Sequence, residues 1–187
     1  MSKMRPVYFT SDHHFYHENI IKYCNRPFRS VGEMHDQMIA KWNKAVPNDA
    51  RVYYLGDFGW GDRDSIEAVL VELNYDQLVW VPGNHDRSVT WIDKLASMAT
   101  QVVAMNGPMR VNHGGREYII SHEPVPKDDM QMGDVNLHGH IHCHRLVRRD
   151  AGCLWFNVGV DMNKFRPWRL SEIEARMKKV LPHDVAA

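Results

Sequence analysis

Short polar clusters that follow apolar runs are the feature that most constrains this chain. There are five such clusters, and together they offer Asp, Asn and His side chains. They are Asp12-His13-His14, Gly56-Asp57, Gly83-Asn84-His85-Asp86, Ser121-His122 and Gly139-His140-Ile141-His142. In open α/β sheets, the loops beyond the carboxyl ends of the strands form the binding crevice. If the preceding runs share a sheet, these clusters converge in space.

β-rich runs and helical patterns alternate through the first half of the chain, as they do in α/β proteins. The β-rich runs are Val7 to Thr10, Arg51 to Leu55, Gln77 to Val81, Gln101 to Met105, Tyr118 to Ile120 and Leu154 to Val158. Ser30 and Glu33 form a capping box before an apolar stripe that reaches Trp42, which predicts a helix. Two further helices are predicted, one over Asp64 to Leu73 and one beginning near Thr90.

The second half of the chain is richer in strands. Gly114-Gly115 and Ala151-Gly152 each separate two β-like runs, which predicts two hairpin turns. No internal repeat, low-complexity tract or Ser/Gly/Pro-rich linker divides the chain. We therefore expect one domain over residues 1–187.

Charge balance indicates which classes of partner the chain can bind, and cysteine content indicates the cellular compartment. Lys+Arg 23 balances Asp+Glu 23, so no bulk field favours a long polyanion or an anionic membrane surface. The cysteines form no CxxC pair, which favours a reducing cytoplasm over a disulfide framework. No cleavable signal or membrane-length apolar stretch is apparent. We expect a cytoplasmic protein without a membrane partner that acts on a small substrate, as a monomer or a dimer.

The donor set of the polar clusters suits mixed N/O coordination of Mn, Fe, Zn, Ni or Co. It contains more potential ligands than one ion needs, because a single catalytic zinc takes about three protein ligands plus water. Two ions that share a carboxylate would use all of these groups. The clusters therefore predict a site for two divalent ions.

The order of the motifs resembles that of the calcineurin-like metallophosphoesterases. The series reads Asp-x-His, Gly-Asp, Gly-Asn-His-Asp, His and Gly-His-x-His, from Asp12 to His142. Several motifs in order at reasonable spacing are specific, whereas any one alone is weak. Three further segments resemble a compact bacterial or phage branch of that family: His17 to Ile21, Arg26-Pro27-Phe28 and Asn157 to Asp161.

The resemblance implies an α/β fold of two facing mixed β-sheets flanked by helices, a four-layer αββα sandwich with metals at one edge. It also implies a role for each matching residue. One metal is bound by Asp12, His14 and His142, and the other by Asn84, His122 and His140, with Asp57 bridging both. His85 contacts the phosphate or protonates the leaving oxygen, and Asp86 orients its ring.

Four residues outside the motif series are assigned less specifically. His17 and Asn19 either line the substrate pocket or stabilise their loop by hydrogen bonds. Arg26 is a candidate for gripping the phosphate, with a solvated surface position as the alternative. Asp161 either holds a metal-binding His or serves a turn.

The function implied by the resemblance is hydrolysis of a phosphate ester with two divalent ions, Mn before Fe, Zn, Ni or Co. Water held between the ions attacks phosphorus in line, assisted by His85. We expect a small phosphodiester or nucleotide-type substrate. A nuclease on the same scaffold is one alternative, because the run from His144 to Arg149 is basic. A catalytically silent metal-binding interaction module is another.

Overall fold

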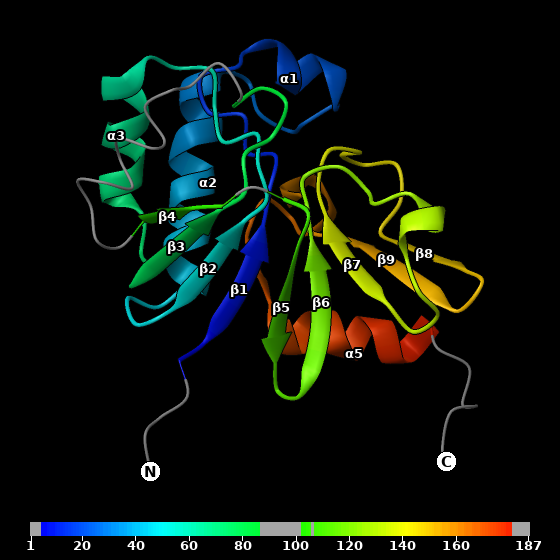
Figure 1. Ribbon diagram of the computed structural model, residues 1–187. Helices are drawn as coiled ribbons and strands as arrows, with labels where there is room; N and C mark the ends of the chain where they lie inside the picture. Colours follow the sequence, from blue (N-terminus) through cyan, green and yellow to red (C-terminus); the bar gives the residue numbers. More distant parts are fainter. Residues whose placement is uncertain (1–4, 87–101, 106, 181–187) are drawn as a thin grey trace.

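Two five-stranded sheets form the frame of the described part of the protein. The computed structural model describes residues 5–86, 102–105 and 107–180 (Figure 1). The first sheet has the order β10-β1-β2-β3-β4. Its strands are β1 Val7–Thr10, β2 Arg51–Tyr54, β3 Gln77–Trp80, β4 Val102–Ala104 and β10 Trp168–Arg169. Strands β1 to β4 are parallel and β10 is antiparallel to β1.

The second sheet has the order β5-β6-β7-β9-β8. Its strands are β5 Met109–His113, β6 Arg116–Ile120, β7 Val135–His138, β8 Val147–Asp150 and β9 Cys153–Asn157. Strands β6, β7 and β9 are parallel. The antiparallel pairs β5–β6 and β8–β9 confirm both predicted hairpins. Gly114-Gly115 and Ala151-Gly152 have positive φ angles, as tight hairpin turns require.

Helices α2 Val31–Ala45 and α3 Arg63–Glu72 confirm two of the predicted helices. The short helix α1 Asn19–Tyr23 was not predicted. The short 3-10 helices η1 Lys127–Asp129 and η2 Val160–Met162 and the helix α5 Leu170–Val180 follow later in the chain. The Ser30 hydroxyl accepts a hydrogen bond from the backbone amide of Glu33, which confirms Ser30 as the N-cap, whereas the Glu33 carboxylate accepts from the amide of Arg29 instead of that of Ser30. The helix predicted near Thr90 lies outside the described residues. None of the described helices is both long and apolar enough to cross a bilayer.

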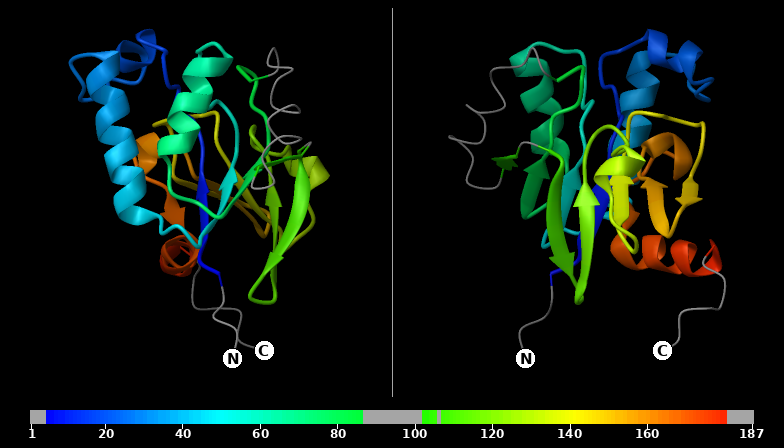
Figure 2. Two further views of the ribbon diagram at one scale, coloured as in Figure 1. Left: turned by 90° about the vertical axis from the view of Figure 1, so that its left-hand side faces the viewer. Right: turned by 45° about the vertical axis from the view of Figure 1, so that its right-hand side comes forward.

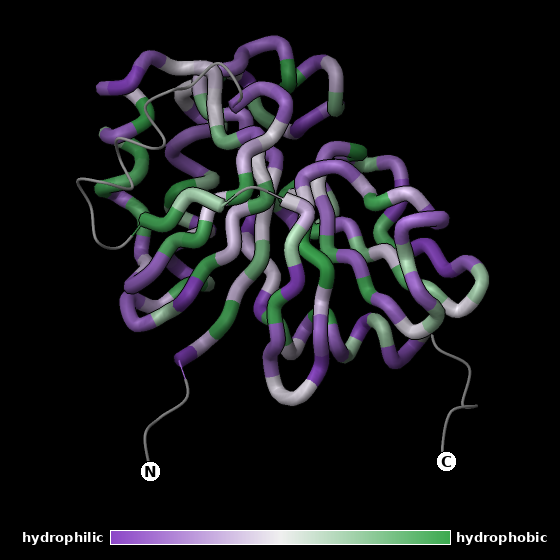
Figure 3. Tube along the Cα trace, viewed as in Figure 1, coloured by the Kyte–Doolittle hydropathy of each residue, from purple (hydrophilic) through white to green (hydrophobic). Residues whose placement is uncertain are grey.

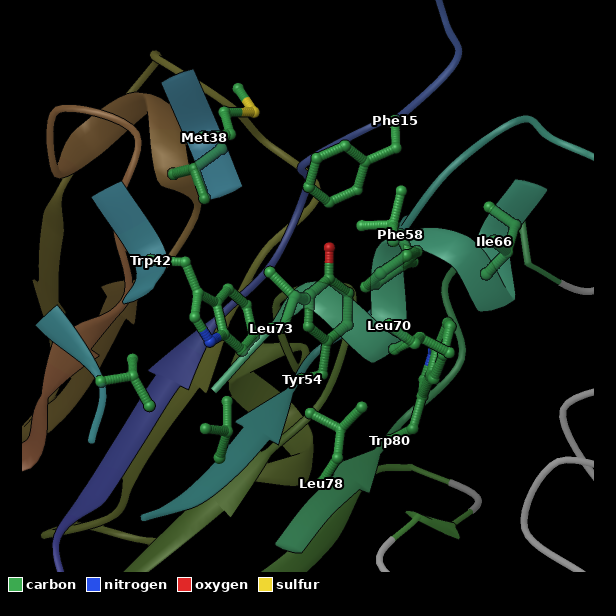
Figure 4. Packing of buried hydrophobic residues seen from close by; sticks show 14 of the residues in the cluster. Phe15, Met38, Trp42, Tyr54, Phe58, Ile66, Leu70, Leu73, Leu78 and Trp80 are labelled. Atoms are coloured by element: carbon green, nitrogen blue, oxygen red, sulfur yellow. The ribbon is translucent and has the colours of Figure 1, made fainter. Parts of the chain in front are cut away.

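The hydrophobic residues form a core on each face of the first sheet. One core lies between that sheet and helices α2 and α3, and Figure 4 shows Trp42, Tyr54 and Trp80 packed within it. The other lies between the two sheets, where the ring centroids of Phe9 and Tyr118 are 6.5 Å apart. Hydrophobic stretches lie along inner strands such as β3 and β6, whereas the edge strand β8 is largely hydrophilic (Figure 3).

The predicted four-layer arrangement is correct for the sheets and for one outer face. Helices α2 and α3 cover the outer face of the first sheet, whereas α5 lies across one end of the molecule (Figures 1 and 2). In the described part of the chain, the segment around η1 takes the place of a helical layer on the second sheet. Its residues Val125 and Met130 pack on Ile119 and Trp155, so a loop covers that face.

Packing of α2 against the first sheet predicts that two methionine substitutions differ greatly in their effect on the free energy of unfolding. Met38→Ala removes a fully buried side chain and leaves a cavity, so we expect about 2–5 kcal/mol less free energy of unfolding. Met132→Ala is the control, because that side chain is 87% exposed. Urea denaturation followed by circular dichroism measures both. Equal midpoints for the two variants would contradict this packing.

Candidate metal centre

The loops that carry the predicted ligands meet at one edge of the two sheets. The loops after β1, β2 and β3 leave the first sheet, and those after β6 and β7 leave the second. Because these strands are parallel within each sheet, their carboxyl ends lie at the same end of the molecule (Figure 1). The prediction that the five clusters converge is confirmed.

Backbone hydrogen bonds align these loops with one another. The amide of Asp12 donates to the Gly56 carbonyl at 3.0 Å, and the amide of His14 donates to the Asp57 carbonyl at 3.1 Å. Across the sheets, the amide of His140 donates to the Asp12 carboxylate at 3.0 Å. The two sheets are therefore joined at the site itself.

Two groups of predicted ligands have the geometry to hold a metal ion. The first is Asp12, His14 and His142, and the second is Asp57, His122 and His140. In the described part of the chain, Cys24, Asp161 and His142 form a third such group, which shares His142 with the first. Within each group, one donor atom per residue lies within 4.8 Å of the others. Asn84 joins the second group, because its Oδ1 is 2.9 Å from His122 Nε2 and 3.0 Å from His140 Nδ1.

Asp57 lies between the two groups. Its Oδ2 is 3.5 Å from His14 Nε2 of the first group and 3.4 Å from His122 Nε2 of the second. Its Oδ1 accepts a hydrogen bond from the backbone amide of His85 at 3.0 Å. One carboxylate therefore faces donors of both groups, which is the arrangement that a shared ligand needs.

Five of the predicted ligands adopt a left-handed backbone conformation that non-glycine residues rarely occupy. Their φ angles are 61° for Asp12, 54° for His14, 58° for Asp57, 70° for His140 and 46° for His142. Such conformations persist only where the surrounding structure holds them, and they cluster at functional sites. Alignment of the loops, rather than local backbone preference, therefore positions these side chains.

The charges and unpaired atoms of the site fit a cation. Burial raises the pKa of Asp12, and the Nε2 atom of His14 is buried without a hydrogen-bond partner. Burial also opposes charge on Asp57 and His122, yet their mutual attraction outweighs it. The pKa of Asp57 falls to about 2 and that of His122 rises to about 9. A metal ion would take the place of the His122 proton beside an ionised carboxylate.

His85 lies at the mouth of the site, and its side chain is 35% exposed. Its Nε2 is 4.0 Å from Asp57 Oδ2. Its ring packs against the rings of His14 and Trp60, with centroids 5.3 Å and 5.1 Å away. The ring is thus placed between the donor groups and solvent, where a substrate would enter.

Asp86 has a different role from the one predicted. Its carboxylate accepts hydrogen bonds from the backbone amides of Asp57 at 2.7 Å, Phe58 at 3.1 Å and Gly83 at 3.0 Å. The indole of Trp80 lies 3.3 Å away as a further donor. These bonds fasten the loop after β2 to the loop after β3. Asp86 therefore positions Asp57 instead of orienting the ring of His85.

Arg26 was predicted either to bind the phosphate or to lie solvated on the surface. Both alternatives are wrong, because its side chain is buried and engaged by other residues. Its side chain is fully buried and forms a bidentate ion pair with Asp161, at 2.8 Å and 2.9 Å. It also donates to the carbonyls of Asp12 and His13. Asp161 in turn lies 3.0 Å from His142 Nδ1, which confirms that it holds a predicted ligand.

The remaining candidates lie at the rim of the site. The ring of His17 packs against those of His14 and Trp60, at 5.5 Å and 5.0 Å between centroids. Asn19 is exposed at the first residue of α1 and belongs to neither donor group. Sequence reasoning missed Trp60 as part of this rim. The available signal was the Gly59-Trp60-Gly61 sequence, which begins one residue after the Gly56-Asp57 motif.

Comparisons with known proteins place the chain among uncharacterised relatives. No family model matches it. The structure of the Aquifex aeolicus protein of unknown function AQ665 is similar, with a TM-score of 0.68, 22% identity, and coverage of 95% of this chain and 100% of that one. The structure of a novel archaeal phosphodiesterase has a TM-score of 0.48 and 18% identity, with coverage of 82% and 83%.

A curated relative is more similar in sequence. The uncharacterized protein MJ1445 of Methanocaldococcus jannaschii is 31% identical over 185 residues, which cover 94% of this chain and 93% of that protein. Identity of this extent over nearly the whole of both chains establishes common descent. The chain therefore belongs to the same protein family as MJ1445.

Proposed function

We propose that this protein hydrolyses phosphate esters with two divalent metal ions. Asp12, His14 and His142 would hold one ion, and Asn84, His122 and His140 would hold the other. The observation that carries the proposal is the position of Asp57, whose Oδ2 faces His14 and His122 at nearly equal distances. The motif order that resembles the calcineurin-like metallophosphoesterases supports the same assignment.

When bound, two such ions lower the pKa of a water molecule between them and offset the charge of the phosphoryl oxygens. The chain supplies the other requirements of the reaction. The buried ion pair of Arg26 with Asp161 fixes the ring of His142. The Asp86 carboxylate fixes the backbone of Asp57. Because these contacts fix His142 and Asp57 before the substrate binds, the two residues need not rearrange when phosphorus is attacked.

His85 is the general acid in this proposal. Its backbone is held by the hydrogen bond to Asp57 Oδ1, while its ring faces the mouth of the site. A phosphate placed between the donor groups would present its leaving oxygen to this ring. A protonated imidazole can donate to that oxygen as the ester bond breaks. No covalent intermediate with a side chain is needed.

Manganese is the first metal to test, because carboxylate, amide and imidazole donors suit it. We expect metal-stripped protein to hydrolyse bis-p-nitrophenyl phosphate and p-nitrophenyl phosphate only after manganese is added. Release of nitrophenolate measures turnover, and the preferred compound separates diesterase from monoesterase activity. Two bound ions with no turnover of either compound would contradict the proposal and favour a silent metal-binding module.

Substitution of His85 separates its role in turnover from the role of the metal ligands. We expect His85→Ala to retain its manganese and to lose about a hundredfold in kcat, as loss of a general acid does. His144→Ala is the matched control, since His144 is exposed beyond the last motif. Metal content by plasma mass spectrometry and kcat on bis-p-nitrophenyl phosphate provide the two measurements. Unchanged kcat in His85→Ala would rule out this role.

A further inference from the structure

A continuous strip of rings leads from the donor groups to the surface. It begins at the predicted ligand His14, continues through His85 and His17, and ends at Trp60 and Tyr23. The centroid distances between neighbouring rings are 5.0–6.2 Å. Trp60 is 60% exposed and Tyr23 is 73% exposed. We call these five side chains the aromatic strip.

The backbone of Trp60 is held in place, although its side chain is exposed. Its backbone amide donates to the Phe15 carbonyl at 2.7 Å. A Cβ atom at Gly59 would come within 2.8 Å of that same carbonyl oxygen, and one at Gly61 within 3.0 Å of the Tyr16 ring. The two glycines thus let the backbone pack closely against its surroundings directly before and after Trp60. An exposed indole on a fixed backbone binds a flat partner at little cost in conformational entropy.

The position of Trp60 relative to the donor groups matches the shape of a nucleotide. The Nε2 atom of His85 is 4.0 Å from Asp57 Oδ2, and the centroid of its ring is 5.1 Å from that of Trp60. Trp60 is therefore one ring away from the place of the phosphate. In a nucleotide, one sugar ring separates the phosphate from the base.

We propose that Trp60 stacks on the base of a nucleoside phosphate whose phosphate lies at the metal centre. This inference rests on the proposed function, because it needs a phosphate beside His85. Indole and nucleobase rings stack through their faces, and stacking is tolerant of base identity. Trp60 therefore selects nucleotides as a class and does not distinguish among bases.

Binding of two phosphonates tests the proposal without turnover. The probes are the methylene phosphonate analogues of AMP and of ribose 5-phosphate, which lack the ester oxygen and differ only in the base. Isothermal titration calorimetry on manganese-loaded protein gives both Kd values. We expect Trp60→Leu to weaken the AMP analogue about five- to a hundredfold. The ribose analogue should change by less than about twofold, since it makes no stacking contact.

Two further variants complete the test. Trp60→Phe keeps a ring and should retain most of the affinity for the AMP analogue, and Met132→Ala, which removes a side chain exposed elsewhere, should change neither Kd. Equal losses for both probes, or no preference for the AMP analogue in the unaltered protein, would overturn the proposal. A dimer dissociated by Trp60→Leu in analytical ultracentrifugation, without a change in either Kd, would also overturn it.

The design distinguishes failure of this inference from failure of the proposed function. Base preference is read from binding, and the metal-dependent reaction is read from hydrolysis of bis-p-nitrophenyl phosphate. Turnover without base preference leaves the phosphoesterase proposal intact and removes the role of Trp60. Base preference without turnover supports nucleotide binding by a protein that does not cleave its ligand.

Discussion

Burial of two carboxylates at the seam between the sheets is the constraint on which the site depends. Asp12 is fully buried and Asp57 is 2% exposed. Buried carboxylates need compensating charge or hydrogen bonds, because removing a charge from water costs several kcal/mol. Here imidazoles surround them, and five predicted ligands adopt strained backbone angles to bring their side chains together. Bringing these donors together costs free energy of folding, and bound cations would compensate the buried negative charge.

A second set of buried contacts holds this arrangement. Arg26 and Asp161 are 135 positions apart, and their ion pair joins the loop after α1 to the end of the second sheet. Arg26 also binds carbonyls of the loop after β1, so one guanidinium supports both sheets at the site. Asp86 has a similar role between the loops after β2 and β3. Arg26 and Asp86 do not belong to the donor groups. They hold the loops that carry the donor residues.

The features that sequence predicted well are local ones. Strands β1, β2 and β3 follow from apolar runs, and α2 follows from its cap and stripe. Strand β7 was missed because polar Asn136 and His138 interrupt its apolar pattern, although both are buried. Asn136 is satisfied by bonds to Val125 and Ile119, partners that sequence does not indicate.

The ligand motifs could be read from sequence because each is short and follows its strand directly. The roles of Arg26 and Asp86 could not, because they depend on which loops become neighbours. An arginine near a predicted phosphate site favours a phosphate contact, yet burial directs Arg26 to Asp161. Trp60 was overlooked for the same reason, since its value lies in its distance from His85 rather than in its own motif.

Anomalous diffraction from crystals soaked in manganese tests the central claim most directly. The account predicts two peaks about 3.5–4 Å apart, as in other two-metal sites. One should be bound by Asp12, His14 and His142, the other by Asn84, His122 and His140, with Asp57 in contact with both. A single peak, or peaks that Asp57 does not bridge, would contradict it.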